Sequence, residues 1–596
     1  MTSSFAPNPS TAQARVIADE LARCGVTDAV LAPGSRSAAL AIAMHEMPSI
    51  RLHVEIDERS AGFCALGLGR ATARPAPVVV TSGTAVANLL PAVVEADLAG
   101  VPWLVLAADR PAELRDTGAN QTIDQTQLFG NAVRWFVDLG VAEDRPGAVA
   151  YWRSVIARAT AEARGVRAAP GPVHVNVPFR EPTVPVSDDG RSRAAQFSHA
   201  LEGRPGGRAW THVSRSPRSV PADGLASVAE QVRASTRGLI VVGESDVEAD
   251  PVNELAHAAG FPVVAEPLSP VRADRASGDD AVISTAHWLA AHPPFAAEHR
   301  PDLVLRVGRA GLSRPLTVLL DDAIPHVLVD ADGRWLDPDR SVGDLVVAEP
   351  GALCAAVAHQ LTGDDAREQR RDWMQSWRTA DRVARAALDT LLASDDAPSE
   401  PRTARDTAAA VPDGGTLVVA SSMPVRDLDM VMRPRTGLRV LGNRGASGID
   451  GFVSTALGVA LGAGGPTVAL AGDLSLLHDR NGFLLTPDGE AADCTFVICQ
   501  NDGGGIFNLL PPATHAPGFE RLFGTPHGMD VGDVARSHGL EHTVIDRAHE
   551  LPDAIGESCA TGGVRLLEVR TDRVEQAALR TRMRAVTGEA LDAAPR

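Results

Sequence analysis

The chain has 596 residues, with 56 basic and 75 acidic side chains, which give a formal net charge of −19 at neutral pH. Every basic residue is arginine, because the sequence contains no lysine. This absence excludes Schiff-base chemistry on a lysine and a phosphate loop that ends in Lys-Ser/Thr. The acidic charge argues against a protein that coats nucleic acid or an anionic membrane.

Length and hydropathy point to a cytoplasmic protein of several domains. No run approaches the roughly 18 apolar residues of a membrane span. The N-terminus lacks the charged and apolar regions of a signal peptide. The six cysteines are scattered, mostly in apolar strings, as in proteins of the reducing cytoplasm. We therefore expect small-molecule partners, without nucleic acid and without membrane insertion.

Short β-rich runs alternate with amphipathic stretches in the predicted first domain, residues 1–185. Strands are expected at 28–32, 77–81 and 103–107, and a helix at 85–98. Buried strands that alternate with helices predict a parallel, doubly wound sheet, with functional loops at the carboxyl ends of its strands.

Two further α/β domains follow, and a stretch rich in Pro, Ser, Gly and Arg (182–221) separates them from the first. We predict a central Rossmann-like domain at 222–362, a charged helix at 364–392, a linker at 393–402 and a third domain at 403–596. The expected strands lie at 238–242, 262–265, 303–307, 327–329, 416–420, 467–471 and 495–500. The predicted fold class is therefore α/β, with three doubly wound parallel-sheet domains.

Two loops of the third domain carry the most informative pattern. Asp473 follows one predicted strand within Gly472-Asp473-Leu474-Ser475, and Asn501 follows the next strand, 28 residues later. Both loops should lie at one edge of the sheet, where a carboxylate and an amide oxygen suit a hard cation. We predict that Asp473, Asn501 and the Gly503 carbonyl bind Mg²⁺ or Mn²⁺ together with a diphosphate. The alternative is an ordinary Gly-Asp turn.

This arrangement resembles the diphosphate motif of thiamine-diphosphate enzymes, although Leu474 stands where that motif commonly has glycine. Such enzymes also need a glutamate that hydrogen-bonds N1′ of the cofactor's aminopyrimidine. Glu58 occupies the matching position, and Ser82-Gly83-Thr84 matches the turn that follows it in the family. The alternative for such acidic residues is an N-terminal helix cap, which we expect for Glu55 and Asp57.

Segments 32–37, 117–121 and 442–451 narrow the resemblance. Together with the Gly472 loop they are similar to the 2-succinyl-5-enolpyruvyl-6-hydroxy-3-cyclohexene-1-carboxylate synthases of menaquinone biosynthesis, a subfamily that also replaces the glycine at the Leu474 position. The likeness covers both outer domains and is weaker in the central one. It implies a pyrimidine-binding first domain and a diphosphate-binding third domain.

The resemblance implies a transferase that decarboxylates 2-oxoglutarate on thiamine diphosphate and adds the succinyl carbanion equivalent to isochorismate. Both substrates are dianions, which arginine binds through charge-assisted hydrogen bonds. The implied substrate-binding residues are Ser35, Arg36, Asn120, Gln121, Arg314, Ser422, Arg426 and Arg444. We assign Arg426 and Arg444 to 2-oxoglutarate, and Arg36 and Arg314 to isochorismate.

The same resemblance supplies the cofactor site. Ile449 would impose the bent cofactor conformation, although an isoleucine after glycine also suits a core position. Phe507 and Leu510 would form an apolar wall, which core packing explains equally well. His53, His478 and His527 are candidates for proton handling without an assigned role. The implied cofactor-binding residues are Glu58, Ser82, Gly83, Thr84, Ser422, Ile449, Gly472, Asp473, Leu474, Ser475, Asn501 and Phe507.

The family's assembly implies a homodimer or homotetramer, because the first domain of one subunit faces the third domain of its partner. Two alternative functions remain at this stage. One is another thiamine-diphosphate enzyme, such as a 2-oxoacid decarboxylase or an acetolactate-synthase-like carboligase. The other is a non-catalytic α/β regulator that retains a nucleotide-like pocket.

Overall fold

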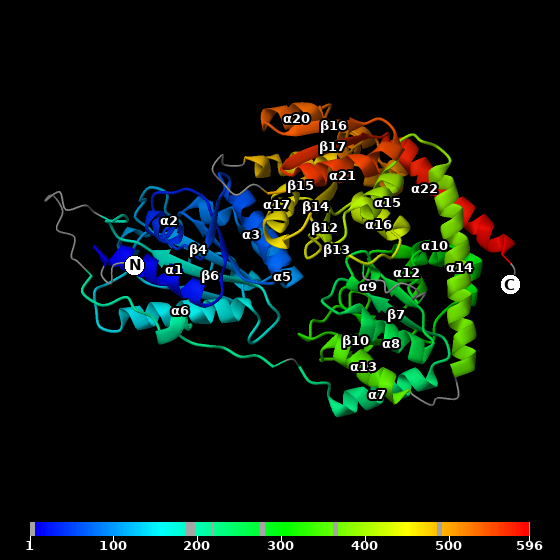
Figure 1. Ribbon diagram of the computed structural model, residues 1–596, viewed down its shortest axis with the longest axis horizontal. Coiled ribbons are helices and arrows are strands. Elements are labelled where there is room, and N and C mark those ends of the chain that lie inside the picture. The colour runs from blue at the N-terminus through cyan, green and yellow to red at the C-terminus, as the bar shows by residue number, and fades with distance from the viewer. Residues whose placement is uncertain are drawn as a thin grey trace. The chain divides into compact units, whose positions relative to one another are not determined.

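The computed structural model describes residues 6–185, 197–216, 218–273, 281–361, 367–484 and 492–594. Its named strands form three sheets, and every pair of neighbouring strands runs parallel (Figure 1). The predicted α/β class is thus confirmed. Among the described residues, no helix combines the length and the apolar character needed to cross a membrane.

The chain divides into two compact units that do not follow the sequence order. One unit comprises Met1–Arg215, Asn443–Gly464 and Ser475–Asp493. The other comprises Ser216–Gly442, Gly465–Leu474 and Cys494–Arg596. We call them the first and the second unit. Two segments of the predicted third domain therefore pack within the first unit.

The sheet of the first unit has the strand order β2-β1-β3-β4-β6-β5. Alternate residues of its buried strands face opposite sides, so that Val79 and Leu104 contact one helical layer and Val78 and Val105 the other. The strands are β1 (Asp28–Leu31), β2 (Arg51–Val54), β3 (Ala76–Val80), β4 (Trp103–Asp109), β5 (Trp135–Asp138) and β6 (Pro172–Pro178).

Helices cover both faces of this sheet. One face packs against α1 (Pro9–Arg23), α2 (Ala38–His45) and α6 (Ala148–Ala163), and the other against α3 (Glu58–Thr72) and α5 (Leu90–Ala99). The helix expected at 85–98 is divided into α4 (Thr84–Ala87) and α5. Pro91 explains the break, because proline has no N–H to donate to the carbonyl four residues earlier.

The second unit contains a central sheet of order β11-β10-β9-β7-β8. Its strands are β7 (Gly238–Val242), β8 (Val263–Ala265), β9 (Leu303–Val307), β10 (His326–Val329) and β11 (Val342–Val346). One face packs against α7 (Ala222–Ala234), α8 (Ala249–Ala259) and α13 (Pro350–Gln360). The other packs against α10 (Ala286–Ala290), α11 (Pro293–Glu298), α12 (Arg314–Leu319) and α14 (Arg367–Ala393); α9 spans Pro270–Ala273.

The third sheet, also in the second unit, has the order β13-β12-β14-β15-β17-β16, which repeats the topology of the first sheet strand for strand. Its strands are β12 (Gly415–Val419), β13 (Leu438–Leu441), β14 (Thr467–Gly472), β15 (Cys494–Gln500), β16 (Glu541–Ile545) and β17 (Val564–Arg570). The helices of the region are α15 (Glu400–Ala410), α16 (Met423–Val431), α18 (Asp473–His478), α19 (Pro512–His515), α20 (Val531–Ser537), α21 (Leu551–Thr561) and α22 (Arg573–Ala593).

Helices α15, α16, α21 and α22 share one hydrophobic core with this sheet, and α22 lies beside the long helix α14 (Figure 1). Helix α15 begins at Glu400, inside the predicted linker 393–402. That part of the linker prediction is wrong. Pro401 does not prevent a helix here, because it stands in the first helical turn, where a backbone N–H would have no partner within the helix.

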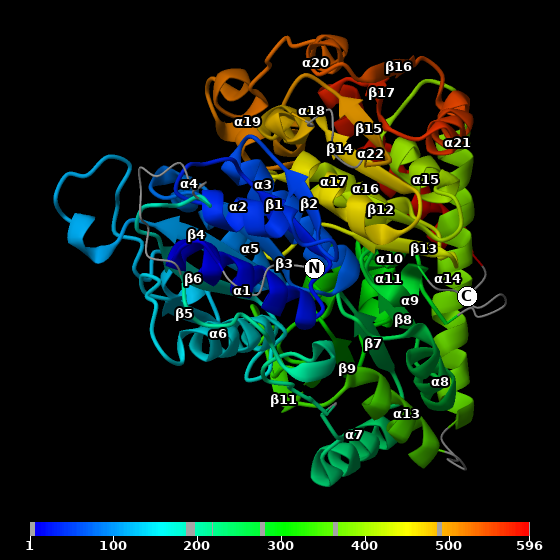
Figure 2. The same cartoon turned by 60° about the vertical axis from the view of Figure 1, so that its left-hand side comes forward.

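Helix α17 (Phe452–Ala463) packs against α3 within the first unit (Figure 2). Glycines allow the two backbones to approach closely. A Cβ atom on Gly67 would lie 2.2 Å from the Thr455 carbonyl oxygen, and one on Gly458 would lie 2.0 Å from the Cys64 carbonyl oxygen. The small residues of both helices are therefore explained by helix-to-helix packing.

Candidate active site

The ends of neighbouring strands β14 and β15 bring Asp473, Asn501 and Gly503 together. The backbone N–H groups of Asn501 and Gly503 donate to Asp473 Oδ2 at 3.2 and 3.0 Å. The Leu474 N–H donates to Asp473 Oδ1 at 2.6 Å. Asp473 itself is 2% exposed. The predicted metal ligands thus occupy one loop cluster at the carboxyl edge of the third sheet.

The oxygen atoms of this cluster fit a hard cation. Asn501 Oδ1 is buried and accepts no hydrogen bond from the described residues, whereas Asn501 Nδ2 donates to Glu400 Oε1 at 2.6 Å. Gly503 has a φ of 136°, and a Cβ atom there would lie 2.0 Å from the Gly524 carbonyl oxygen. An amide oxygen, a carboxylate and a backbone carbonyl are ligands that Mg²⁺ accepts. The described residues contain no cluster of three or more His, Cys, Asp or Glu side chains suited to a metal.

Room for a ligand lies next to this cluster. A Cβ atom on Gly472 would meet nothing within 4 Å, so the backbone there is open to a neighbouring group. Ser475 is buried in α18, and half-buried Phe507 packs with Phe523 at a ring-centroid distance of 5.5 Å. A phosphate can approach a glycine backbone of this kind closely.

His527 contacts the Asp473 carboxylate directly. Its Nδ1 accepts the Met529 N–H at 3.0 Å, which leaves the proton on Nε2, and Nε2 lies 3.2 Å from Asp473 Oδ2. Burial raises the pKa of Asp473, while hydrogen bonds from the Gly503 N–H and His527 oppose that shift. His527 therefore helps to hold the carboxylate in place.

Glu58 is the first residue of α3 and is partly exposed. Within the described chain its carboxylate makes no side-chain hydrogen bond, so both oxygens are available to a ligand. Asp57 caps the helix by accepting the Arg59 N–H at 2.9 Å, as expected. The cap role expected for Glu55 is wrong: Glu55 is buried, and burial, together with the charges of Asp479 and Asp57, raises its pKa to about 8.

The turn after β3 is tied to the loop that contains Gln121. Ser82 Oγ donates to the Gln121 carbonyl at 2.9 Å, and Gln121 Nε2 donates to the Ser82 carbonyl at 3.0 Å. The Gly83 N–H donates to Gln125 Oε1 at 3.0 Å. Thr84 and Asn120 are exposed beside these contacts. Two predicted segments about 40 residues apart thus form one surface.

Two arginines lie at this surface. Arg36 donates to the Phe179 carbonyl at 3.1 Å and forms an ion pair with Glu181 at 3.1 Å. Arg110 donates to Ser82 Oγ and, at 3.0 Å, to the Gln121 carbonyl. Burial and the positive charge of Arg36 lower the pKa of Arg110. Arg110 is not among the residues predicted from the sequence, although its position directly after β4 follows the same strand-end rule that indicated Asp473 and Asn501.

The other predicted arginines lie on separate elements. The loop that contains Arg444 and Ile449 is held by Glu95, which accepts the Gly445 and Ala446 N–H groups at 2.8 and 2.6 Å. Arg426 in α16 donates to the Ser422 carbonyl at 2.6 Å, and Ser422 adopts a φ of 72°, which is strained for a residue with a side chain. Arg314 begins α12 and is exposed, as is Ser35 after β1.

The predicted site residues are shared between the two units. The first unit contains Ser35, Arg36, Glu58, Ser82, Gly83, Thr84, Asn120, Gln121, Arg444, Ile449 and Ser475. The second unit contains Arg314, Ser422, Arg426, Gly472, Asp473, Leu474, Asn501, Gly503 and Phe507.

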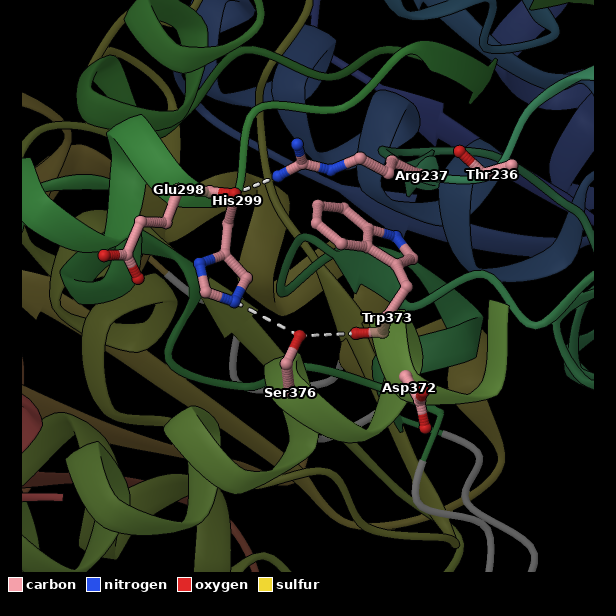
Figure 3. Close-up of a pocket in the computed structure, with 7 residues that line it drawn as sticks. All are labelled: Thr236, Arg237, Glu298, His299, Asp372, Trp373 and Ser376. Atoms are coloured by element: carbon pink, nitrogen blue, oxygen red, sulfur yellow. Dashed lines mark hydrogen bonds between the residues drawn. The ribbon is translucent and has the colours of Figure 1, made fainter. Parts of the chain in front are cut away.

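A separate cavity of about 520 Å³ lies in the central part of the second unit and contains none of these residues (Figure 3). His299 Nε2 lies 3.1 Å from Ser376 Oγ, which donates to the Trp373 carbonyl at 2.7 Å. The Arg237 guanidinium stacks on the Trp373 ring, 4.8 Å from its centroid. Several polar groups that line the cavity thus form hydrogen bonds with one another. The lining residues are Thr236, Arg237, Glu298, His299, Asp372, Trp373 and Ser376.

Comparison with known proteins assigns the family. Residues 12–128 match the thiamine pyrophosphate enzyme N-terminal TPP binding domain, and residues 427–569 match the C-terminal TPP binding domain of the same enzymes. The 2-succinyl-5-enolpyruvyl-6-hydroxy-3-cyclohexene-1-carboxylate synthase of Thermobifida fusca is 49% identical over 98% of this chain and 100% of its own length. The chain belongs to this synthase family. The protein is thus a thiamine-diphosphate-dependent enzyme, and the regulator alternative is excluded.

Further relatives carry the same name. The synthase of Saccharopolyspora erythraea is 45% identical over 98% of this chain and 100% of its own, and that of Chloroflexus aurantiacus is 42% identical over 94% and 93%. These similarities favour the synthase over the acetolactate-synthase-like or decarboxylase alternative. The two matched domains correspond to the first and third sheets, which share one topology.

Proposed function

We propose that the protein decarboxylates 2-oxoglutarate and adds the resulting succinyl carbanion equivalent to isochorismate, giving 2-succinyl-5-enolpyruvyl-6-hydroxy-3-cyclohexene-1-carboxylate and CO₂ in menaquinone biosynthesis. The observation that carries this proposal is the 49% identity to a synthase of that name over nearly the whole chain. The arginine pair in the first unit and the oxygen cluster in the second supply the chemistry that two dianions and a diphosphate require.

Thiamine diphosphate, when bound, would supply a nucleophilic carbon and an electron sink for the decarboxylation. Glu58 would exchange a proton with N1′ of the aminopyrimidine. Asp473, Asn501 and the Gly503 carbonyl would bind Mg²⁺ or Mn²⁺ and so neutralise the diphosphate. Ile449 would support the bound cofactor in its reactive conformation, and Phe507 would contribute an apolar wall beside it.

The substrate carboxylates would be bound by two groups of residues. Arg36 and Arg110, with Ser35, Asn120 and Gln121, would bind isochorismate together with Arg314. Arg426 and Arg444 would bind 2-oxoglutarate with Ser422. A hydrogen bond to a charged group contributes about 1.5–3 kcal/mol, so two or three arginines suffice to select a dianion.

We further propose that the enzyme works in the cytoplasm as a homodimer, or as a pair of such dimers, with Glu58 of one copy completing the site of the other. We also propose that residues 1–185 form the pyrimidine-binding domain, residues 222–362 the central domain and residues 403–596 the diphosphate-binding domain. A dilution series that yields an active, cofactor-loaded monomer would contradict the assembly.

The direct test is an assay of purified protein with thiamine diphosphate, Mg²⁺, 2-oxoglutarate and isochorismate. Product should form with the wild type and should be largely lost in Glu58→Gln. Glu557→Gln, an exposed glutamate on α21, is the matched control and should keep full activity. Full activity of Glu58→Gln would refute the N1′ assignment. Turnover of pyruvate without any need for isochorismate would instead favour an acetolactate-synthase-like or decarboxylase function.

A further inference from the structure

We propose that Glu400 is a positioning residue for the metal site: it fixes the Asn501 amide so that its oxygen faces the cation. This inference rests on the proposed function, since it concerns the same metal site. No sequence motif points to Glu400, which lies 101 residues before Asn501 in the chain.

The hydrogen bond between the two side chains determines which way the amide points. An ionised carboxylate only accepts hydrogen bonds, so the NH₂ group of Asn501 must face Glu400 Oε1, at 2.6 Å. Asn501 Oδ1 is consequently directed away from Glu400, and it is the buried acceptor without a partner among the described residues. Leaving such an acceptor without a partner costs about 1–3 kcal/mol. A bound cation removes that cost.

Glu400 is itself held rigidly. Arg580 Nη2 donates to Glu400 Oε2 at 2.6 Å, and the Glu400 N–H donates to Gln576 Oε1 at 3.0 Å. Thr571 Oγ donates to Glu400 Oε1 at 3.4 Å. The Glu400 residue is 3% exposed, so its carboxylate has little freedom to turn away from Asn501.

The same hydrogen-bond network includes α16, the helix that carries the predicted substrate-binding residue Arg426. Arg580 on α22 also donates to Asp427 through Nε at 2.9 Å and Nη2 at 2.6 Å. Asp427 lies on α16 beside Arg426. One arginine therefore ties α15, which carries Glu400, to α16. With both carboxylates ionised, the group of Glu400, Asp427 and Arg580 carries one net negative charge, which favours a cation next to it.

A purely structural role is the competing explanation, because buried ion networks also stabilise folds. The two explanations differ in what they predict for metal affinity. A structural network that is weakened lowers thermal stability and leaves the affinity of the folded enzyme unchanged. Loss of an orienting partner typically weakens metal binding by about 10–100-fold.

The experiment measures Mn²⁺ affinity of the full-length enzyme with thiamine diphosphate, from the electron paramagnetic resonance signal of free Mn²⁺. Glu400→Gln should bind Mn²⁺ about 10–100-fold more weakly than wild type, with activity regained at high Mn²⁺. Glu568→Gln is the matched control: Glu568 is 1% exposed and bonds His542 and Arg570, and among the described residues it makes no hydrogen bond to Asn501. It should lose stability and keep its affinity. Equal affinity of Glu400→Gln and wild type, or an equal loss in Glu568→Gln, would overturn the proposal.

A double-variant cycle gives a second, independent test. Asn501→Asp places a carboxylate at hydrogen-bond distance from Glu400 Oε1. Repulsion between the two carboxylates should turn the new side chain out of its metal-binding position, and this loss of geometry should weaken Mn²⁺ binding despite the added charge. Combining Asn501→Asp with Glu400→Gln exchanges donor and acceptor while keeping the network's charge, so the double variant should bind Mn²⁺ more tightly than Asn501→Asp alone. Affinity equal to or below that of Asn501→Asp would refute the orienting role, even where Glu400→Gln alone fails to fold. Wild type that binds no Mn²⁺ would instead refute the metal site of the proposed function.

Discussion

Substituting Gly67 by alanine should force apart helices α3 and α17. The added Cβ atom would lie 2.2 Å from the Thr455 carbonyl oxygen and 2.9 Å from the Val459 nitrogen. A carbon–oxygen contact needs about 3.3 Å, so the helices must separate by about 1 Å. Both neighbouring atoms belong to the backbone of a buried helix, so no side-chain rotation relieves the clash.

The magnitude follows from two opposing effects. Overpacking of a core costs about 1–3 kcal/mol, and alanine gains about 1 kcal/mol over glycine in a helix. Because the obstacle here is backbone, we expect a net destabilisation of about 1–2 kcal/mol. The displacement should also affect activity, because α3 begins at Glu58 and α17 follows the loop that contains Arg444 and Ile449. A shift of about 1 Å can lower kcat by about 100-fold.

Differential scanning calorimetry and steady-state kinetics test this prediction together. Gly556→Ala is the control, because Gly556 lies within α21 and a Cβ atom there would meet nothing within 4 Å. That variant should be slightly more stable than wild type and equally active. A Gly67→Ala enzyme as stable and as active as the Gly556→Ala enzyme would refute the close-packing argument.

Three other variants test the site and its surroundings. The pKa of Glu55, raised to about 8, lies above the value of about 4.3 in an unfolded chain, so wild-type stability should fall as pH rises through that interval. Glu55→Gln should remove this fall, giving a difference in melting temperature that grows from about pH 5 to 8; a pH-independent difference would contradict it. Gly503→Ala should abolish Mn²⁺ and thiamine-diphosphate binding measured by calorimetry, because φ is 136° and the Cβ atom would strike Gly524; retained binding would contradict the loop geometry. Arg110→Ala should raise the KM for isochorismate by about 10–100-fold, from the 1.5–3 kcal/mol of a charged hydrogen bond, and should affect the KM for 2-oxoglutarate much less; equal effects on both substrates would argue against the assigned subsite.

The sequence predicts the strands of this protein better than the contacts between distant segments. Residues 238–242 and 303–307 coincide with β7 and β9, because continuous apolar runs are typical of buried parallel strands. The strand ends in turn placed Asp473 and Asn501 next to each other. Glu400 lay outside this reasoning, since its partner Arg580 is 180 residues away and no local pattern encodes that pairing.

Helix α17 shows a different limit of the sequence. In the sequence, α17 lies between β13 and β14 of the third sheet, yet it packs with α3 of the first unit. The sequence shows small residues in both helices, but the size of a residue does not identify the helix that it packs against. Only the fold shows that Gly67 and Gly458 face backbone carbonyls of the opposite helix.

Because the chain lacks lysine, arginine has both the structural roles and the proposed substrate-binding roles. The partners of each arginine help to separate the two kinds of role. Buried Arg580 is paired with two carboxylates, and buried Arg272 donates to backbone carbonyls such as those of Ala265 and Met432. Arg36 pairs with the exposed Glu181, yet burial and the nearby positive charge of Arg36 still lower the pKa of Arg110. A dianion placed between the two arginines would relieve their repulsion, so binding energy at this surface should come from charge as well as from hydrogen bonds. Relief of this repulsion is thus a second source of binding energy at the proposed isochorismate site, beside the charged hydrogen bonds that Arg36 and Arg110 would form.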